Sequence, residues 1–375
     1  MRAFIFIALT LSLAACREDA QTPRATLDVG ELLSAPADPR FERALEPREL
    51  EFPRDHGPHA SFQTEWWYFT GNLADDEGRE FSYQLTFFRR ALGVLPPPGT
   101  SPWNARDVFM AHFAVGDIAR ERFVAFERFE RGALGLAGAE TTPWRVWTRD
   151  WSAAGDLEHG PVRLAASDGE VELSLTLHPA AAGSADIVLH GERGLSRKGA
   201  HAGNASYYYS IPTLLTEGTL RLGGRALRVR GASWFDREWS TSALEAGQVG
   251  WDWFALRFDD GSALMLYLMR REDGTRDTAS SGTFVESDGS VHALRLDDFA
   301  VDVRARRRME RSGTEYPARW SVRVPRFELE CEIDALLPES ELALAVRYWE
   351  GPVRATAKRG ARESSARGFV ELTGY

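Results

Sequence analysis

The sequence predicts an all-β protein built from two related barrel-like halves. Short runs in which apolar and polar residues alternate recur between Gly, Asp and Pro breaks, and helical periodicity is hardly seen. One aromatic hairpin pattern also occurs twice, which predicts the two halves. Many short strands with closely spaced turn signals favour barrels or sandwiches over a parallel α/β sheet.

The N-terminal segment has the layout of an export signal. Met1 and Arg2 precede an apolar run, and small residues then lead to Cys16. We therefore expect a lipoprotein signal peptide over residues 1–16 that ends at a lipidated Cys16, an ordinary secretory signal being the alternative. The lipid would anchor the chain in the cell envelope, facing the periplasm. Because Arg17 rather than Asp follows the cysteine, the outer membrane is favoured.

The rest of the chain is expected to be a tether followed by strands. Residues 17–48 are rich in Ala, Pro, Arg and Asp without a strict period, which is typical of a tether, and the folded part begins near Phe52. The period-two runs predict strands, in order, at 80–88, 108–115, 162–166, 171–177, 219–222, 253–258, 263–269, 320–324, 327–333, 342–348 and 369–372.

The repeated hairpin occupies residues 66–90 and 251–271. Each copy has an aromatic strand, an acidic turn with glycine, an apolar strand and two arginines at the exit. The seam between the halves is expected around 225–232, where glycines interrupt the pattern. We accordingly expect an N-terminal domain over 49–228 and a C-terminal domain over 229–375.

Composition excludes several classes of protein. The 375 residues are 43% hydrophobic, which is enough core material for two domains. A formal net charge of -10, with Lys and Arg scattered among more numerous acids, argues against nucleic-acid binding. With lipid on Cys16, Cys331 has no disulfide partner in the chain, and its place in an alternating run predicts a buried, inert thiol.

Familiar cofactor and catalytic motifs are missing from the sequence. It contains no Gly-rich phosphate loop, no paired CxxC, no HExxH and no GxSxG. His56 and His59 are close, but the Gly-Pro between them suits a loop better than a metal site. Neither a cofactor nor a metal is therefore expected.

The densest polar and aromatic cluster occupies 234–240 and 250–253. In a strand, Asp236 and Glu238 share one face with Trp234, while Arg237 and Trp239 point to the other. The acids could then project into a cavity walled by indole rings, where burial raises a carboxyl pKa toward values useful to a general acid. A structural ion pair of Asp236 with Arg237 or Arg257 is the alternative. The cluster supplies Asp236 and Glu238 as candidate catalytic residues, and Trp234, Arg237, Trp239, Trp251, Asp252 and Trp253 as candidate ligand-binding residues.

A second cluster lies in the first half. Glu65 stands beside two indoles, Trp66 and Trp67, as the counterpart of Asp252. His112 lies in an apolar run, where it is either a core residue or a catalytic one. Tyr208 belongs to a run of three tyrosines, for which sheet packing is the alternative. This cluster adds Glu65 and His112 as candidate catalytic residues, and Trp66, Trp67 and Tyr208 as candidate ligand-binding residues.

From about residue 50 to the last residue, the chain resembles the AttH and carotenoid 1,2-hydratase family of lipocalin-like proteins. The segments that carry the resemblance are 56–59, 64–68, 128–138, 194–199, 204–210, 234–240, 250–253, 348–351 and 371–375. The resemblance implies tandem lipocalin-like antiparallel β-barrels. Members are commonly labelled predicted secreted hydrolases and are often encoded near an export-type ABC transporter, a possible partner here.

The hydratase members add water across a terminal carbon–carbon double bond of an acyclic carotenoid. That reaction needs an acid that protonates the alkene and aromatic faces that stabilise the cation. The family usually shows Asp-His-Glu-Trp where this chain has 236–239, so a guanidinium that keeps its proton replaces a titratable imidazole. Proton transfer by residue 237 would be lost. Asp236 or Glu238 could still act, or Arg237 could bind an anionic group.

Two functions remain open. The first is an enzyme of the hydratase or hydrolase type with Asp236 and Glu238 as acid and base. The second is a non-catalytic accessory lipoprotein that carries an isoprenoid- or lipid-like ligand for an ABC transporter. Both require that two closed sheets enclose an apolar chamber bordered by the tryptophans and acids of 234–253.

Overall fold

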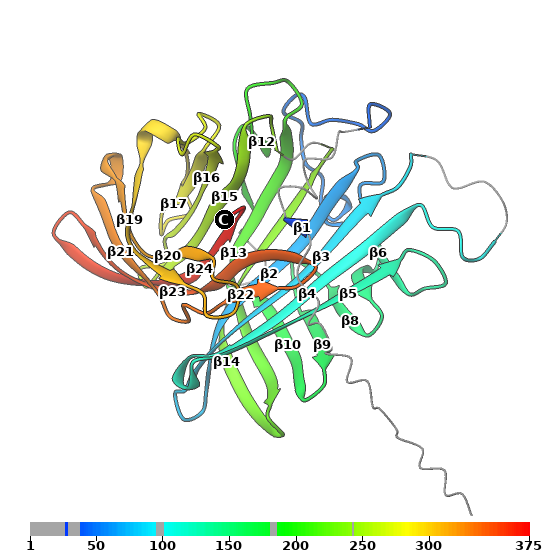
Figure 1. Cartoon of the computed structure of the whole chain (residues 1–375), viewed down its shortest axis with the longest axis horizontal. Coiled ribbons are helices and arrows are strands. Elements are labelled where there is room, and N and C mark those ends of the chain that lie inside the picture. Colours follow the sequence, from blue (N-terminus) through cyan, green and yellow to red (C-terminus); the bar gives the residue numbers. More distant parts are fainter. Residues whose placement is uncertain (1–26, 29–37, 95–100, 181–185, 242–243) are drawn as a thin grey trace, which may run out of the picture.

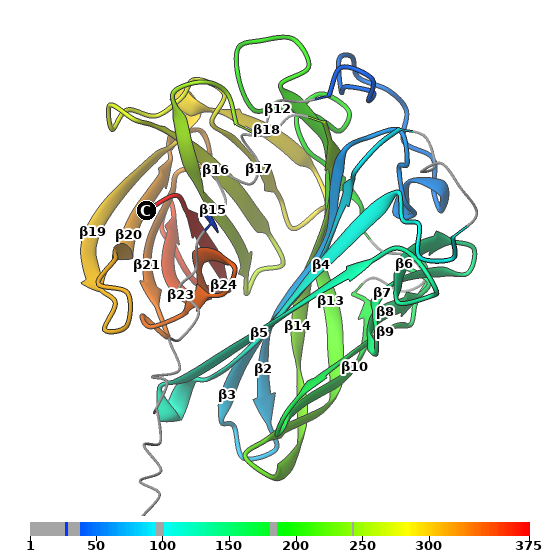
Figure 2. The same ribbon diagram turned by 45° about the vertical axis from the view of Figure 1, so that its right-hand side comes forward.

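The structure, a computed structural model, describes residues 27–28, 38–94, 101–180, 186–241 and 244–375. Almost all regular structure is β, in two large sheets that lie against each other (Figures 1 and 2). The sheets form a nearly closed barrel and a half-barrel, which confirms the all-β, barrel-like prediction. Cys16 and the expected signal peptide lie outside the described residues. Within the described ranges, no helix combines the length and the hydropathy needed to span a bilayer.

The first sheet follows the order β5-β4-β3-β2-β14-β13-β10-β9-β8-β7-β6, with β11 and β12 also paired to β13. Ion pairs of Arg128 with Asp150 and of Arg149 with Glu130 join the edge strand β5 to the turn between β7 and β8, near the other end of the sheet. Its elements are η1 (Arg54–His56), β2 (Thr64–Asp75), β3 (Glu80–Ala91), β4 (Asp107–Asp117), η2 (Ile118–Arg120), β5 (Arg122–Arg131), β6 (Ala137–Thr141), β7 (Trp144–Thr148), β8 (Trp151–Gly155), β9 (Val162–Asp168), β10 (Val171–Pro179), β11 (Val188–Leu189), β12 (Leu195–Arg197), β13 (Ala205–Leu222) and β14 (Arg225–Ser240).

The second sheet follows the order β18-β17-β16-β15-β24-β23-β21-β20-β19. A short β1 (Leu27–Asp28) adds to β23 in parallel, and β22 also pairs with β23. The remaining elements are β15 (Gln248–Phe258), β16 (Ala263–Arg271), β17 (Ser281–Val285), β18 (Val291–Arg295), η3 (Leu296–Asp298), β19 (Ala300–Arg308), β20 (Glu315–Val324), η4 (Pro325–Phe327), β21 (Leu329–Ala335), β22 (Glu341–Ala343), β23 (Val346–Arg359) and β24 (Arg362–Thr373).

Each sheet has its own apolar core on its inner face. Phe69 and Phe235 pack in the core of the first sheet, and Phe254 and Trp320 pack in that of the second. A third apolar cluster, which includes Trp253, joins the outer faces of the two sheets. Because side chains alternate along a strand, one central strand contributes both to its own core and to this contact between the sheets.

The sheet boundary differs from the expected domain boundary. Residues 228 and 229 fall inside β14, which pairs with β13 and β2 of the first sheet. The two sheets therefore divide between Ser240 and Gln248. Gly223 and Gly224 have φ angles of +58° and +75°, and they form the tight turn of the β13–β14 hairpin. Such a turn favours glycine at both positions, so the glycine pair marks a hairpin instead of a linker.

Two of the predicted strands also differ from the observed elements. The run 327–333 begins as a strand only at Leu329, because Phe327 ends η4 and Glu328 has a left-handed φ of 50°. The run 342–348 is split into β22 and β23, which pair as a hairpin. Cys331 is buried, and burial raises the pKa of its thiol to about 12, which confirms the expectation of a buried thiol.

Candidate functional site

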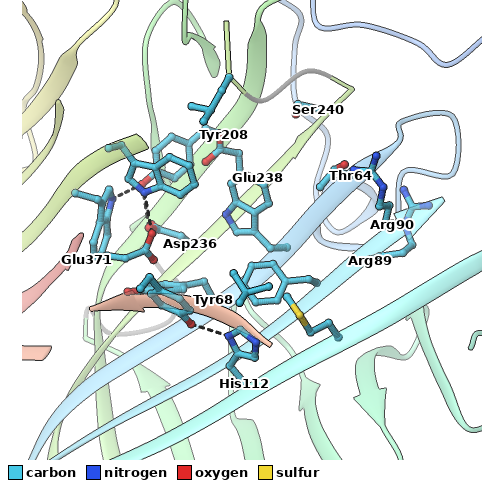
Figure 3. Close-up of a pocket in the computed structure, with 18 of the residues that line it drawn as sticks. Thr64, Tyr68, Arg89, Arg90, His112, Tyr208, Asp236, Glu238, Ser240 and Glu371 are labelled. Atoms are coloured by element: carbon cyan, nitrogen blue, oxygen red, sulfur yellow. Dashed lines mark hydrogen bonds between the residues drawn. The ribbon is translucent and has the colours of Figure 1, made fainter. Parts of the chain in front are cut away.

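A pocket of about 310 Å³ lies between the two sheets. Strands β2, β3, β4, β5, β13 and β14 supply one wall, and β15, β16, β23 and β24 supply the other (Figure 3). The volume is at the lower end of ligand-binding cavities, which run from roughly 300 to 1,000 Å³. The expected chamber inside closed sheets is thus corrected: the inner faces of the sheets hold the cores, and this pocket is formed where the outer faces meet.

Strand register arranges the wall from the first sheet in three rows. The inner row holds Asp236, Tyr68, Thr86 and His112, and it is almost fully buried. The middle row holds Glu238, Trp66, Phe88 and Met110. The outer row holds Ser240, Thr64, Arg90 and Val108. Successive rows are two residues apart along each strand, so their side chains share one face at a spacing of about 7 Å.

Asp236 is the central acid of the inner row. Its carboxylate accepts hydrogen bonds from Tyr208 Oη at 2.9 Å, from Trp234 Nε1 at 2.6 Å and from Ser210 Oγ. Burial raises the pKa of Asp236 to about 7, although these three donors oppose the rise. Its oxygens accept from these neutral donors, and neither Arg237 nor Arg257 pairs with it, so the structural ion pair considered above is not formed.

A buried histidine positions one of these donors. His190 Nε2 lies 2.6 Å from Ser210 Oγ, and His190 Nδ1 lies 2.8 Å from Thr283 Oγ1. Because Ser210 donates its proton to Asp236, the serine oxygen accepts from His190 Nε2–H. This series of hydrogen bonds connects Asp236 of the first sheet to Thr283 on β17 of the second sheet.

Two further acids come from the second sheet, and sequence reasoning missed both. Glu371 of β24 accepts a 2.7 Å hydrogen bond from Trp251 Nε1, and burial raises its pKa to about 7. Glu350 of β23 lies opposite Glu371 on the neighbouring strand and accepts a 2.5 Å hydrogen bond from Tyr68 Oη. Burial and the charge of Glu371 hold the pKa of Glu350 well above its ordinary range. Both acids stand in segments that carry the family resemblance, which was the available signal.

His112 is a hydrogen-bond donor at the inner end of the pocket. Burial lowers its pKa to about 3, so the ring is neutral near pH 7. Its Nδ1 lies 2.7 Å from Tyr348 Oη (Figure 3). Tyr348 Oη also accepts a hydrogen bond from Gln84 Nε2. Among the described residues Nδ1 is the only hydrogen-bond acceptor within reach of the phenol proton, so the phenol donates to Nδ1 and the ring proton lies on Nε2. Nε2 has no partner among the described residues, so this N–H can bind a ligand oxygen.

Glu238 has a different role from Asp236, although both face the pocket. Lys198 Nζ lies 3.3 Å from Glu238 Oε1 and 3.9 Å from the ring centre of Tyr267. Glu238 therefore forms a buried ion pair with a lysine that also sits over an aromatic ring. Of the predicted residues, the structure brings seven to this pocket: Trp66, His112, Tyr208, Asp236, Glu238, Trp251 and Trp253.

Other predicted site residues lie on the opposite faces of their strands, and their expected contact with a ligand is corrected. Arg237 forms an ion pair with Glu65 in the core of the first sheet, and its guanidinium carbon lies 4.0 Å from the ring centre of Trp67 and 5.1 Å from that of Trp239. Asp252 is 2.9 Å from Arg270 Nε, also away from the pocket. The alternation of side chains along β2, β14 and β15 is the physical reason.

Trp234 is a supporting residue behind the pocket wall. Its Nε1–H binds Asp236, and its ring contacts that of Trp253 edge to face at 6.3 Å.

The arginine at position 237 does not reach the pocket. The replacement of the usual family histidine therefore removes no proton carrier from this cavity.

The raised pKa values predict how stability depends on pH. The pKa of Asp236 rises from 3.8 to about 7 on folding and that of Glu371 rises from 4.5 to about 7, so the folded state binds more protons in this interval. The free energy of unfolding should accordingly fall as pH rises from about 4 to about 7. Over this interval the free energy of unfolding of the double variant Asp236→Asn, Glu371→Gln should fall by about 6 kcal/mol less than that of the wild type, with about 3 kcal/mol from each carboxyl.

Urea unfolding of both proteins across this pH range checks the prediction. Groups with the opposite behaviour, such as Asp55 with its lowered pKa, are common to both proteins and cancel in the comparison. Equal pH dependence in the two proteins would contradict the assignment of raised pKa values to these two carboxyls.

Comparisons with known proteins agree with this architecture. A family model described as AttH-like matches residues 43–375. A crystal structure from Nitrosomonas europaea, described as an AttH, is 31% identical with a TM-score of 0.76, covering 91% of this chain and 99% of that one. The structure of kievitone hydratase from Nectria haematococca is 14% identical with a TM-score of 0.65, covering 89% and 98%. CghA with Sch210972 is 12% identical with a TM-score of 0.51, covering 83% and 88%. At these identities the last two show the fold alone, and the search of curated proteins gave no match.

Proposed function

We propose that this chain, which belongs to the AttH-like family, uses the pocket between its sheets to add water to an apolar unsaturated ligand, or to remove it. One observation carries the proposal. Asp236 from the first sheet and Glu371 from the second face the same apolar cavity, and burial raises the pKa of each carboxyl to about 7. A hydratase with the same fold, kievitone hydratase, supports the reaction class.

The charge balance of the pocket favours acid–base chemistry. The charges of Asp236, Glu238, Glu350 and Glu371 act on one another, and among the described residues only Glu238 of these four forms an ion pair, with Lys198. Neighbouring carboxyls in a medium of low dielectric cannot all ionise, so at least one of these four keeps its proton near neutral pH. A carboxyl that titrates near the working pH is an effective proton donor, and its ionised neighbour is an effective acceptor.

The proposed reaction has two proton transfers. A protonated carboxyl donates its proton to one carbon of the double bond, which forms a C–H bond and leaves a cation on the other carbon. The faces of Trp251 and Trp253 stabilise that cation. Water attacks the cation through its oxygen, and the ionised carboxylate takes the released proton. An alkene and one water thus yield one alcohol, and His112 Nε2–H can bind its oxygen.

The second candidate function is binding without catalysis. The specific observation in its favour is the predominance of aromatic and aliphatic side chains such as Trp66, Phe88 and Met110 in the lining. In this case the chain would carry a lipid-like ligand. A lipid on Cys16 would hold it at the periplasmic side of the outer membrane, where an ABC transporter could be its partner.

An isotope experiment separates the two functions. The purified protein is incubated with acyclic isoprenoids, including an acyclic carotenoid and geraniol, in water labelled with heavy oxygen, and products are analysed by mass spectrometry. The hydratase proposal expects labelled alcohol from the wild type and none from Glu371→Gln. Binding of these probes without any label uptake would support the carrier instead, and failure of every probe to bind would contradict both functions.

A further inference from the structure

We propose that the ligand is an amphiphile whose anionic end group, a carboxylate or a phosphate, is bound by Arg90 at the opening of the pocket. This inference rests on the proposed function, because it assumes that the pocket between the sheets is the ligand site. Beyond the proposed function, it states the class of ligand and which end of the ligand lies at the opening of the pocket.

Arg90 is a cation that faces the pocket, and no carboxylate of the described residues pairs with it. It stands in the outer row between Thr64 and Val108, and it is only partly exposed. In the described part of the chain it makes no ion pair, and burial alone lowers the pKa of its guanidinium. Its neighbour Arg89 points to the other face and pairs with Glu65 and Asp107. A guanidinium held partly away from water with no counterion is stabilised when an anion binds.

The rest of the opening is apolar. Leu92 is 63% exposed and Phe129 is 50% exposed, and both line the pocket. Large apolar side chains left in solvent beside a cavity mark a place where an apolar chain enters. Exposure also increases from the inner row to the outer row, so the opening lies at the Arg90 end.

The distances fit an extended apolar chain between two polar ends. Arg90 lies four residues along β3 from Thr86, the inner-row residue of that strand, which corresponds to about 13 Å. The middle row, with Trp66, Phe88 and Met110, fills this interval. A ligand whose anionic group binds Arg90 would place its far, unsaturated end beside Asp236 and Glu371.

The acids of the pocket fix the direction of binding. Lys198 already forms an ion pair with Glu238, and the pocket is lined further in by Asp236 and Glu371, with Glu350 hydrogen-bonded to Tyr68. An anionic group would be repelled there and attracted to Arg90. The planar guanidinium suits carboxylate and phosphate equally, so the probe experiment must distinguish the two.

The test compares three probes with the same apolar chain: dodecanoate, dodecyl phosphate and dodecanol. Their affinities are measured by isothermal titration below the concentrations at which they form micelles. We expect the wild type to bind at least one anionic probe about tenfold to a hundredfold more tightly than the alcohol. The probe with the larger advantage identifies the end group.

Variants assign that advantage to one side chain. Arg90→Gln should bind the anion and the alcohol equally, whereas Arg90→Lys should keep part of the difference. Arg163→Gln, which removes an exposed arginine on β9, is the control and should behave as the wild type. Equal affinities for all probes in the wild type, or an unchanged preference in Arg90→Gln, would overturn this inference and leave the pocket as a ligand site. If no probe binds, the pocket does not take up apolar chains, and both this inference and the proposed function are contradicted.

Discussion

Asp236→Asn is expected to reduce turnover of an unsaturated ligand by about a hundredfold to ten-thousandfold, the usual contribution of a positioned general acid or base. Asparagine has nearly the same shape: its oxygen can still accept from Trp234 Nε1–H and Ser210 Oγ–H, and its amide N–H can donate to Tyr208 Oη, so the pocket should keep its form. It cannot donate a proton to carbon or accept one from water at neutral pH. Ligand affinity should therefore change little while the rate falls.

Single-turnover kinetics and titration of the ligand measure the two quantities separately. Asp75→Asn, at the far end of β2 where the carboxylate only braces a hairpin turn, is the matched control and should keep the wild-type rate. The wild-type rate should also depend on pH near 7, because Asp236 and Glu371 titrate there among Glu238, Glu350 and Lys198. Full activity in Asp236→Asn would rule out this carboxyl as the acid or the base.

Glu65→Ala is expected to lower the free energy of unfolding by about 3–5 kcal/mol, because it leaves two buried arginines without their shared partner. Glu65 is fully buried on the core face of β2, and its carboxylate pairs with both Arg89 and Arg237. It also accepts a 3.0 Å hydrogen bond from the backbone N–H of His59. Burial without these partners would raise the pKa of Glu65, but the two arginines and His59 hold it well below its ordinary value.

Urea unfolding near neutral pH measures this loss. Glu77→Ala, which removes a carboxylate that is 77% exposed, is the control and should change stability by no more than about 0.5 kcal/mol. Since the lowered pKa of Glu65 makes its contribution disappear as pH falls through that pKa, the difference between wild type and variant should shrink in acid. A loss below about 1 kcal/mol at neutral pH would show that water reaches the two arginines in the variant.

The position of Arg237 shows how far local pattern can be interpreted. The alternation correctly placed Asp236 and Glu238 on one face and Arg237 and Trp239 on the other. It gave no means to decide which face borders a ligand, so both faces entered the candidate site. The structure resolves this choice, because the face with Arg237 packs into the core of the first sheet.

Glu371 and Glu350 show the opposite limit. Each lies in an ordinary strand pattern, and neither is near Asp236 in the chain. Their proximity to Asp236 depends on the pairing of β24 with β15 and on the contact between the sheets. Local spacing carries no information about such long-range pairs, since the register that joins them is set by strands far apart in sequence.

By itself the sequence determined the all-β class, about half of the strands and the side-chain alternation within each of them, because these depend on a period of two and on turn residues. The family followed from motifs spread along the chain. Only the tertiary structure decided that the sheets meet through their outer faces, that the pocket lies in this contact, and that Asp236 is joined there by Glu371. The physical reason is that a strand specifies what lies on each of its faces, whereas the packing of whole sheets decides what each face will meet.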